Sequence, residues 1–174
     1  MGTTAADFWR HNTDLRDITP RGERFPEVGL FDVLRSACQG VVFDFGCGDG
    51  RLSPAFDPDR YFGFDINATA LKVARVTNPK HRYVTQWLPA DTWLAWTVLL
   101  HVPDDELPAV LDGANRYSRI VVGEVMGRRW RREGEPPVFN REPEEYEAMF
   151  ERPVMRMQVP YPRYGCDLTV LVFD

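Results

Sequence analysis

Residues 41–50, which read VVFDFGCGDG, constrain the fold more than any other segment of the chain. The apolar run at 41–43 is typical of a strand that is buried on both faces of a parallel sheet. Asp44 follows one residue later, and glycines then alternate at positions 46, 48 and 50. Glycine permits positive φ angles and a close approach between backbone and ligand. The segment therefore predicts a buried strand that enters a ligand-binding turn, with an ordinary glycine-rich turn as the alternative.

The spacing of these glycines distinguishes two kinds of nucleotide-binding turn. The dinucleotide-binding fold uses G-x-G-x-x-G, whose third glycine lets the following helix pack closely on the strand. Counted from Gly46 and Gly48, that third glycine would fall on Arg51, whereas this chain has Gly50 instead. The pattern is therefore acid-x-G-x-G-x-G, which disfavours a dinucleotide site.

A second carboxylate follows Gly46 by nineteen positions. Residues 61–65 read YFGFD, a second apolar run that ends in Asp65, and a helix is predicted from Asn67 to Val76. An acid at the tip of a second strand, about 20 residues after the glycine turn, is placed to accept hydrogen bonds from ribose hydroxyls. The alternative is that Asp65 only caps the helix.

Together the two motifs resemble those of the class I S-adenosylmethionine-dependent methyltransferases, in particular the members that act on small molecules. In that family the glycine loop wraps the methionine part of the cofactor, the second-strand acid holds the ribose, and the next residue packs on adenine. The resemblance implies S-adenosylmethionine as cofactor and S-adenosylhomocysteine as product. The cofactor-binding residues that we expect are Asp44, Gly46, Cys47, Gly48, Asp65, Ile66, Gln86, Trp87 and Thr97.

The stretch expected to contact adenine departs from the family pattern. The family often has an acid before a Leu-Pro pair, whereas residues 85–89 read TQWLP and contain no acid. Gln86 could accept a hydrogen bond, and Trp87 could stack on adenine because the face of an aromatic ring attracts a base without needing charge. The alternative is that Trp87 is a packed core residue.

Residues 97–103, TVLLHVP, follow the expected fourth strand, and open α/β sheets bind ligands at strand carboxyl ends. The stretch resembles the "LHHV" or "LHV" of many small-molecule methyltransferases, and it lacks the Asn/Asp-Pro-Pro-Tyr and Pro-Cys motifs of nucleic-acid methyltransferases. His101 is a candidate general base, because an imidazole with a pKa of about 6.5 exchanges protons near neutral pH. Alternatively it holds the loop, since methyl transfer to a neutral amine or an anion needs no base.

Two aromatic segments are candidates for the substrate side. In residues 128–132, RRWRR, Arg128 and Trp130 could clamp and cover an anionic substrate. Alternatively this is a solvated basic loop that answers Glu133 and Glu135. Near the N-terminus, Trp9 suits a lid over the cofactor, or else packs as plain core.

Apolar runs alternate with helical segments, which indicates an α/β fold. We expect a Rossmann-like, seven-stranded, mostly parallel sheet with an antiparallel C-terminal strand pair and helices on both faces. The expected strands are 41–45, 61–65, 82–85, one within 91–100, 119–125, 154–159 and 167–173, with a turn at 161–165. The expected helices are 5–12, one within 25–38, 67–76, 104–117 and 142–151.

A length of 174 residues suits one domain. We divide it into an N-terminal helical lid (1–39), a cofactor-binding half (40–125) and a substrate-side half (126–174). The net charge of −5 argues against nucleic-acid binding. Three cysteines without a C-x-x-C spacing predict neither a disulfide framework nor a metal site. No secretory signal or long apolar stretch is evident, so a soluble cytoplasmic protein is expected.

The sequence therefore predicts S-adenosylmethionine-dependent methyl transfer to an oxygen or nitrogen of a small molecule, with an anionic acceptor as one option. The alternatives are a nucleic-acid methyltransferase and a non-catalytic S-adenosylmethionine-binding protein. The oligomeric state and the methyl acceptor are left open, because fold does not fix function.

Overall fold

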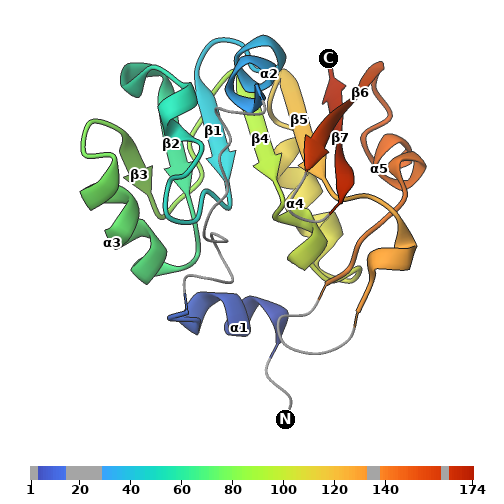
Figure 1. Cartoon of the computed structure of the whole chain (residues 1–174), viewed down its shortest axis with the longest axis horizontal. Coiled ribbons are helices and arrows are strands. Elements are labelled where there is room, and N and C mark those ends of the chain that lie inside the picture. The colour runs from blue at the N-terminus through green and yellow to red at the C-terminus, as the bar shows by residue number, and fades with distance from the viewer. Residues whose placement is uncertain (1–3, 15–28, 133–137, 162–164) are drawn as a thin grey trace.

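The computed structural model describes residues 4–14, 29–132, 138–161 and 165–174. Seven strands form one sheet in the order β3-β2-β1-β4-β5-β7-β6 (Figure 1). The strands are β1 (Val42–Phe45), β2 (Tyr61–Phe64), β3 (Arg82–Val84), β4 (Thr92–Trp96), β5 (Arg119–Glu124), β6 (Val154–Tyr161) and β7 (Cys166–Phe173). The start of the predicted 25–38 segment, the centre of the predicted turn at 161–165, and Glu133 and Glu135 lie outside the described residues.

The direction of the strands agrees with the predicted sheet. β1 pairs in parallel with β2 and β4, and β2–β3 and β4–β5 are parallel as well. β7 lies between β5 and β6 and is antiparallel to both. The prediction of a mostly parallel sheet with an antiparallel C-terminal strand pair is therefore confirmed.

Helices cover both faces of this sheet. They are α1 (Ala5–His11), α2 (Leu30–Ala37), α3 (Ala68–Thr77), α4 (Leu107–Ala114) and α5 (Pro143–Phe150). The fourth helix is shorter than the predicted 104–117. It begins at Leu107, and the carboxylate of Asp104 accepts hydrogen bonds from Arg131 and Arg141 and does not cap the helix.

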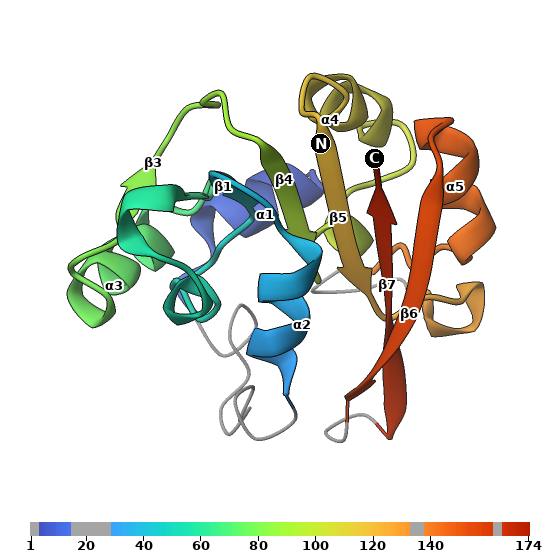
Figure 2. The same cartoon turned by 90° about the horizontal axis from the view of Figure 1, so that it is seen from above.

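The two faces of the sheet carry separate cores because successive strand residues point to opposite sides. Val42 packs in the core that α2 and α3 cover, through Leu34 and Leu71 among others. Phe43 packs in the other core, which α4 and α5 cover. Figure 2 shows α2 on one face and α4 and α5 on the opposite face. The strand predicted from the 41–43 run is thus buried against a core on both faces of the sheet.

The carboxyl ends of β1, β2 and β4 lie at one edge of the sheet, and α1 lies across that edge (Figure 1). Thr4 caps α1, since its hydroxyl accepts the N–H of Asp7 at 3.1 Å. Among the described residues, no helix is long and apolar enough to cross a membrane.

Candidate functional site

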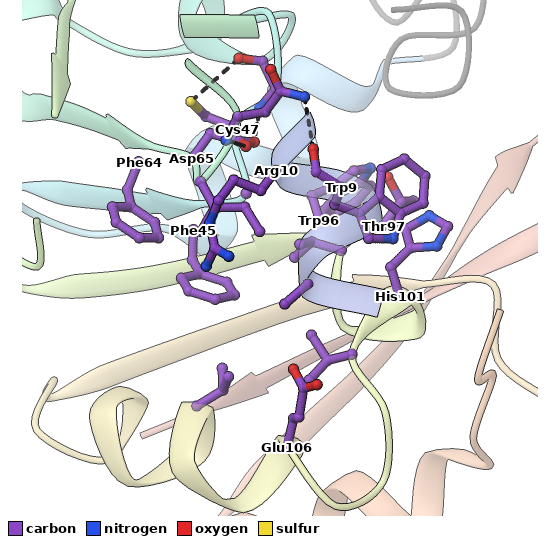
Figure 3. A pocket seen from close by; sticks show the side chains of 18 of the residues that line it. Trp9, Arg10, Phe45, Cys47, Phe64, Asp65, Trp96, Thr97, His101 and Glu106 are labelled. Atoms are coloured by element: carbon purple, nitrogen blue, oxygen red, sulfur yellow. Dashed lines mark hydrogen bonds between the residues drawn. The ribbon is translucent and has the colours of Figure 1, made fainter. Parts of the chain in front are cut away.

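A cavity of about 230 Å³ opens between the carboxyl ends of β1, β2 and β4 and helix α1 (Figure 3). Its lining is mostly apolar and aromatic, with a few charged groups from separate elements. Pockets of this composition, at the carboxyl ends of parallel strands, are where open α/β sheets bind ligands. The cavity is therefore the candidate site.

The glycine turn after β1 forms one wall of the cavity through Gly46, Cys47 and Gly48. Gly46 has a φ of 76° and Gly48 a φ of 57°, values that glycine adopts without strain. A Cβ atom on Gly46 would lie 2.3 Å from a methyl carbon of Val98, so no side chain fits there. The backbone N–H groups of Gly46 and Cys47 donate to the carbonyl of Phe64 at 2.8 and 2.9 Å, which fixes the turn to β2.

Asp65, directly after β2, joins the two predicted motifs. Its Oδ2 accepts the N–H of Gly48 at 2.8 Å, and its Oδ1 accepts the N–H of Asn67 at 2.7 Å. A carboxylate has further acceptor positions on each oxygen, and Asp65 lines the cavity. Burial raises the pKa of Asp65, opposed by the hydrogen bonds from Asn67 and Gly48. The cap of α3 is Asn67, whose Oδ1 accepts the N–H of Ala70 at 2.9 Å.

Asp44, the acid that precedes the glycines of the first motif, is buried and does not line the cavity. Its Oδ2 accepts the hydroxyl hydrogen of Tyr61 at 2.6 Å, and its Oδ1 has no partner among the described residues. Burial raises the pKa of Asp44 to about 7, although the Tyr61 hydrogen bond and Arg51 both act to lower it. The structure thus places Asp44 in the core, bound to Tyr61 of β2 and outside the cavity for which it was predicted.

Gln86 and Trp87, expected near adenine, do not line the cavity. Gln86 is exposed, and the Trp87 ring lies against Phe43 and Phe45 with centroids 5.5 and 5.3 Å apart. Trp87 is 36% exposed and covers an aromatic cluster on the α4 face of the sheet. This geometry matches the alternative of a packed residue for Trp87.

Ile66, by contrast, is 40% exposed and lines the cavity beside Asp65. Thr97 also lines it, directly after β4, with a φ of 50° that is uncommon for a residue other than glycine. Its N–H donates to the carbonyl of Gly123 at 2.8 Å, and its hydroxyl accepts Nη2 of Arg51 at 2.5 Å. Arg51 lines the cavity as well.

His101 and Trp9 meet at the opposite side of the cavity from Asp65 and Cys47 (Figure 3). Their ring centroids are 4.3 Å apart. His101 ends the short helix Leu99–His101 after β4, and Trp9 belongs to α1. Nδ2 of Asn67 donates to the carbonyls of Trp9 and Asn12, both at 2.7 Å, and thereby fixes α1 over the site.

Arg128 and Trp130, expected to bind substrate, lie outside the cavity in the short helix Arg128–Trp130. Arg128 pairs with Glu145 at 2.5 Å, and the neighbouring Arg131 pairs with Asp104 at 2.5 Å. Trp130 is partly exposed. The basic segment thus pairs with acids of other elements, whereas Glu133 and Glu135, the partners in its solvated-loop alternative, lie outside the described residues.

Other residues that line the cavity were not predicted from the sequence. They are Ala6, Arg10, Phe45, Arg51, Phe64, Asn67, Trp96, Val98, Val102, Glu106 and Val110. The sequence could have indicated Phe45, Phe64 and Trp96, because each is the last residue of a strand that leads into one of the motifs. Nothing in the sequence marks Arg10 or Glu106. Within the described ranges, no group of histidine, cysteine, aspartate and glutamate side chains could hold a metal ion.

The chain has the fold of S-adenosylmethionine-dependent methyltransferases, as comparison with solved structures shows. Magnesium protoporphyrin IX methyltransferase from Synechocystis PCC 6803, with bound S-adenosylmethionine, matches with a TM-score of 0.68 at 16% identity, over 97% of this chain and 95% of that one. A complex of DhpI with S-adenosylhomocysteine matches with a TM-score of 0.67 at 18% identity, over 97% and 94%. CalS10, an amino pentose methyltransferase from Micromonospora echinaspora, matches with a TM-score of 0.64 at 16% identity, over 88% and 93%. In sequence, no protein-family model and no curated protein matches.

Proposed function

We propose that the protein binds S-adenosylmethionine and transfers its methyl group to an oxygen or nitrogen of a small molecule. The observation that carries this proposal is the hydrogen bond from the Gly48 N–H to Asp65. It brings the glycine turn of β1 and the acid of β2 together at the cavity, so one ligand can touch both. When bound, the cofactor supplies an electrophilic methyl group on a sulfonium.

The residues at this wall fit such a cofactor. The carboxylate oxygens of Asp65 would accept hydrogen bonds from the ribose hydroxyls, and its two backbone hydrogen bonds hold it in place for them. The backbone of Gly46, Cys47 and Gly48 would follow the methionine part, since no side chain on either glycine obstructs it. Ile66 offers an apolar contact for adenine.

The acceptor would bind on the side of the cavity formed by α1 and the loop after β4. Trp9 and His101 close this side and would exclude water from it. There His101 could take a proton from a hydroxyl or an ammonium. An anionic acceptor would meet Arg10 and Arg51, which line the cavity, in preference to Arg128, which does not.

Calorimetry tests the cofactor first. The protein should bind S-adenosylmethionine and S-adenosylhomocysteine but not NAD. Changing Asp65 to Ala should weaken S-adenosylhomocysteine binding by about 1.5–3 kcal/mol, roughly 10- to 150-fold, because charge-assisted hydrogen bonds are lost. Asp59→Ala is the matched control, since Asp59 is an exposed acid that does not line the cavity. NAD binding without S-adenosylmethionine binding, or an unchanged affinity in Asp65→Ala, would contradict the proposal.

Turnover is tested separately. The protein is incubated with S-adenosylmethionine labelled in the methyl group and with fractionated pools of small metabolites. Label transferred to a metabolite, with release of S-adenosylhomocysteine, supports a methyltransferase and identifies the acceptor. Tight cofactor binding without transfer to any pool would favour a non-catalytic binding protein instead.

A further inference from the structure

Two buried ionisable side chains, Glu124 and Arg141, hold the loop after β4 from the side that faces away from the cavity. Glu124, the last residue of β5, is 1% exposed, and its Oε1 accepts the N–H groups of Val98 and Leu99 at 3.0 and 2.7 Å. Arg141 is also 1% exposed. Its Nη1 donates to the carbonyl of Leu99 at 3.0 Å, and its Nη2 to that of Val102 at 2.7 Å.

Arg141 is itself fixed at the far end of the same loop. Its Nε and Nη2 donate to Oδ1 of Asp104 at 3.0 and 2.6 Å. The two side chains therefore bind both the N–H groups at the start of the loop and the carbonyls along it. A guanidinium can do this because its donors form a rigid planar fork.

The other side of this loop is a wall of the cavity. Val98, His101 and Val102 all line it, whereas neither Glu124 nor Arg141 does. Glu124 binds the backbone N–H of Val98, and Arg141 binds the backbone carbonyl of Val102, the residue next to His101. The backbone on either side of His101 is thus bound by Glu124 and Arg141.

Stability alone is a weak reason for burying this pair. Burying an ionisable group costs several kcal/mol if it stays charged, and well-packed apolar side chains of similar volume are often as stable or more so. The cost is also not fully offset here, because Oε2 of Glu124 has no partner among the described residues. Burial raises the pKa of Glu124 to about 8, against the lowering effect of the Leu99 and Val98 N–H groups and of Arg141.

We propose that Glu124 and Arg141 are positioning residues that fix the loop after β4, and with it His101, against the acceptor in the cavity. The proposal rests on the proposed methyltransferase function. It goes beyond the cofactor site, because both residues act on the acceptor side and touch neither Asp65 nor the glycine turn.

Three substitutions separate positioning from mere stability. Glu124→Gln keeps an oxygen that can accept the two N–H groups, whereas Glu124→Leu removes it at similar size. Arg141→Lys keeps the charge but cannot reach two carbonyls and a carboxylate at once. The first readout needs no substrate: the ring signals of ¹⁵N-labelled histidine, with the His101 signal assigned through His101→Asn. We expect one narrow His101 signal in the wild type and in Glu124→Gln, and a broadened or split signal in Glu124→Leu and Arg141→Lys.

The second readout is transfer of labelled methyl to the metabolite fraction found above. Glu124→Leu should lower kcat by about tenfold or more, since small displacements of positioning groups have effects of that order. Its affinity for S-adenosylhomocysteine should stay that of the wild type, and Glu124→Gln should restore kcat. Arg141→Lys should repeat the loss of kcat, and it decides the matter if Glu124→Leu does not fold.

The proposal is overturned if Glu124→Leu and Arg141→Lys keep wild-type kcat and a single His101 signal. It is also overturned if kcat and S-adenosylhomocysteine affinity fall together, because that is the signature of a general structural defect. Failure of the wild type to bind S-adenosylhomocysteine would refute the proposed function instead. In that case the His101 signal alone decides whether the two residues fix the loop.

Discussion

Replacing Asp44 with asparagine tests whether the first motif acid is a buried core group. The folded protein holds this carboxyl in an apolar environment with a single donor, the Tyr61 hydroxyl at 2.6 Å. Burial raises its pKa from 3.8 to about 7. Between these two values the folded protein keeps a proton that the unfolded chain has already released, so the stability from Asp44 is complete below pH 3.8 and is lost as the pH rises to 7.

The expected size follows from the shift. A pKa raised by roughly three units corresponds to about 4 kcal/mol of unfolding free energy, at about 1.4 kcal/mol per unit. Asparagine resembles the protonated carboxyl in shape and does not titrate. Asp44→Asn should therefore match the wild type near pH 4 and become the more stable protein by pH 8, by a few kcal/mol.

The measurement is urea unfolding at half-unit steps from pH 4 to pH 8, followed by circular dichroism. The difference between wild type and Asp44→Asn isolates Asp44, because other buried acids such as Glu124 titrate in both proteins. Asp59→Asn is the control. Because the Asp59 carboxylate is exposed, a plot of unfolding free energy against pH should run parallel for Asp59→Asn and the wild type. Parallel curves for wild type and Asp44→Asn would refute the raised pKa, and with it the burial argument.

Two further predictions concern the borders of the cavity. Asn67→Asp keeps the side-chain oxygen that caps α3 but loses the N–H donor to the carbonyls of Trp9 and Asn12. Amide exchange should therefore accelerate in residues 4–14 and stay unchanged in α3. Equal protection of residues 4–14 in both proteins would show that Asn67 does not hold α1. Arg128→Ala should leave the KM for an anionic acceptor unchanged, whereas Arg10→Ala should raise it, because Arg10 lines the cavity and Arg128 does not. An Arg128→Ala variant with a raised KM and a normal Arg10→Ala variant would reverse that assignment.

The features that sequence predicted well are those whose physical requirement is local. The apolar run before Asp44 marks a buried strand, and the alternating glycines mark backbone that takes positive φ, as found at Gly46 and Gly48. The spacing from Gly46 to Asp65 spans the connection between two parallel neighbouring strands, which holds only short 3-10 turns, so both residues reach the same edge of the sheet. The order and type of the secondary-structure elements followed from similar local patterns.

The residues that sequence placed less well depend on partners far along the chain. Trp87 was predicted to stack on adenine because of its aromatic ring, and in the structure that ring packs against Phe43 and Phe45 of β1. Arg128 carries the charge that suits an anion, but Glu145 on α5 already pairs with it. Composition and spacing report that a ring or a charge is present. They do not report which other side chains contact or pair with it in the folded protein.

Glu124 is a residue that sequence patterns did not single out, although it binds a loop of the cavity through contacts distant in the chain. It ends an apolar strand like many others, and its bonds go to backbone N–H groups 25 and 26 residues earlier in the chain. The two segments meet because β4 and β5 are neighbours in the sheet, so that Trp96 pairs with Gly123 and both chains leave the sheet at one edge. Backbone groups carry no residue identity, and a motif search cannot detect a side chain whose partners are all main chain. A charged residue at the end of an otherwise apolar strand is therefore informative only once the strand order is known, because it then identifies the neighbouring loop that the residue holds.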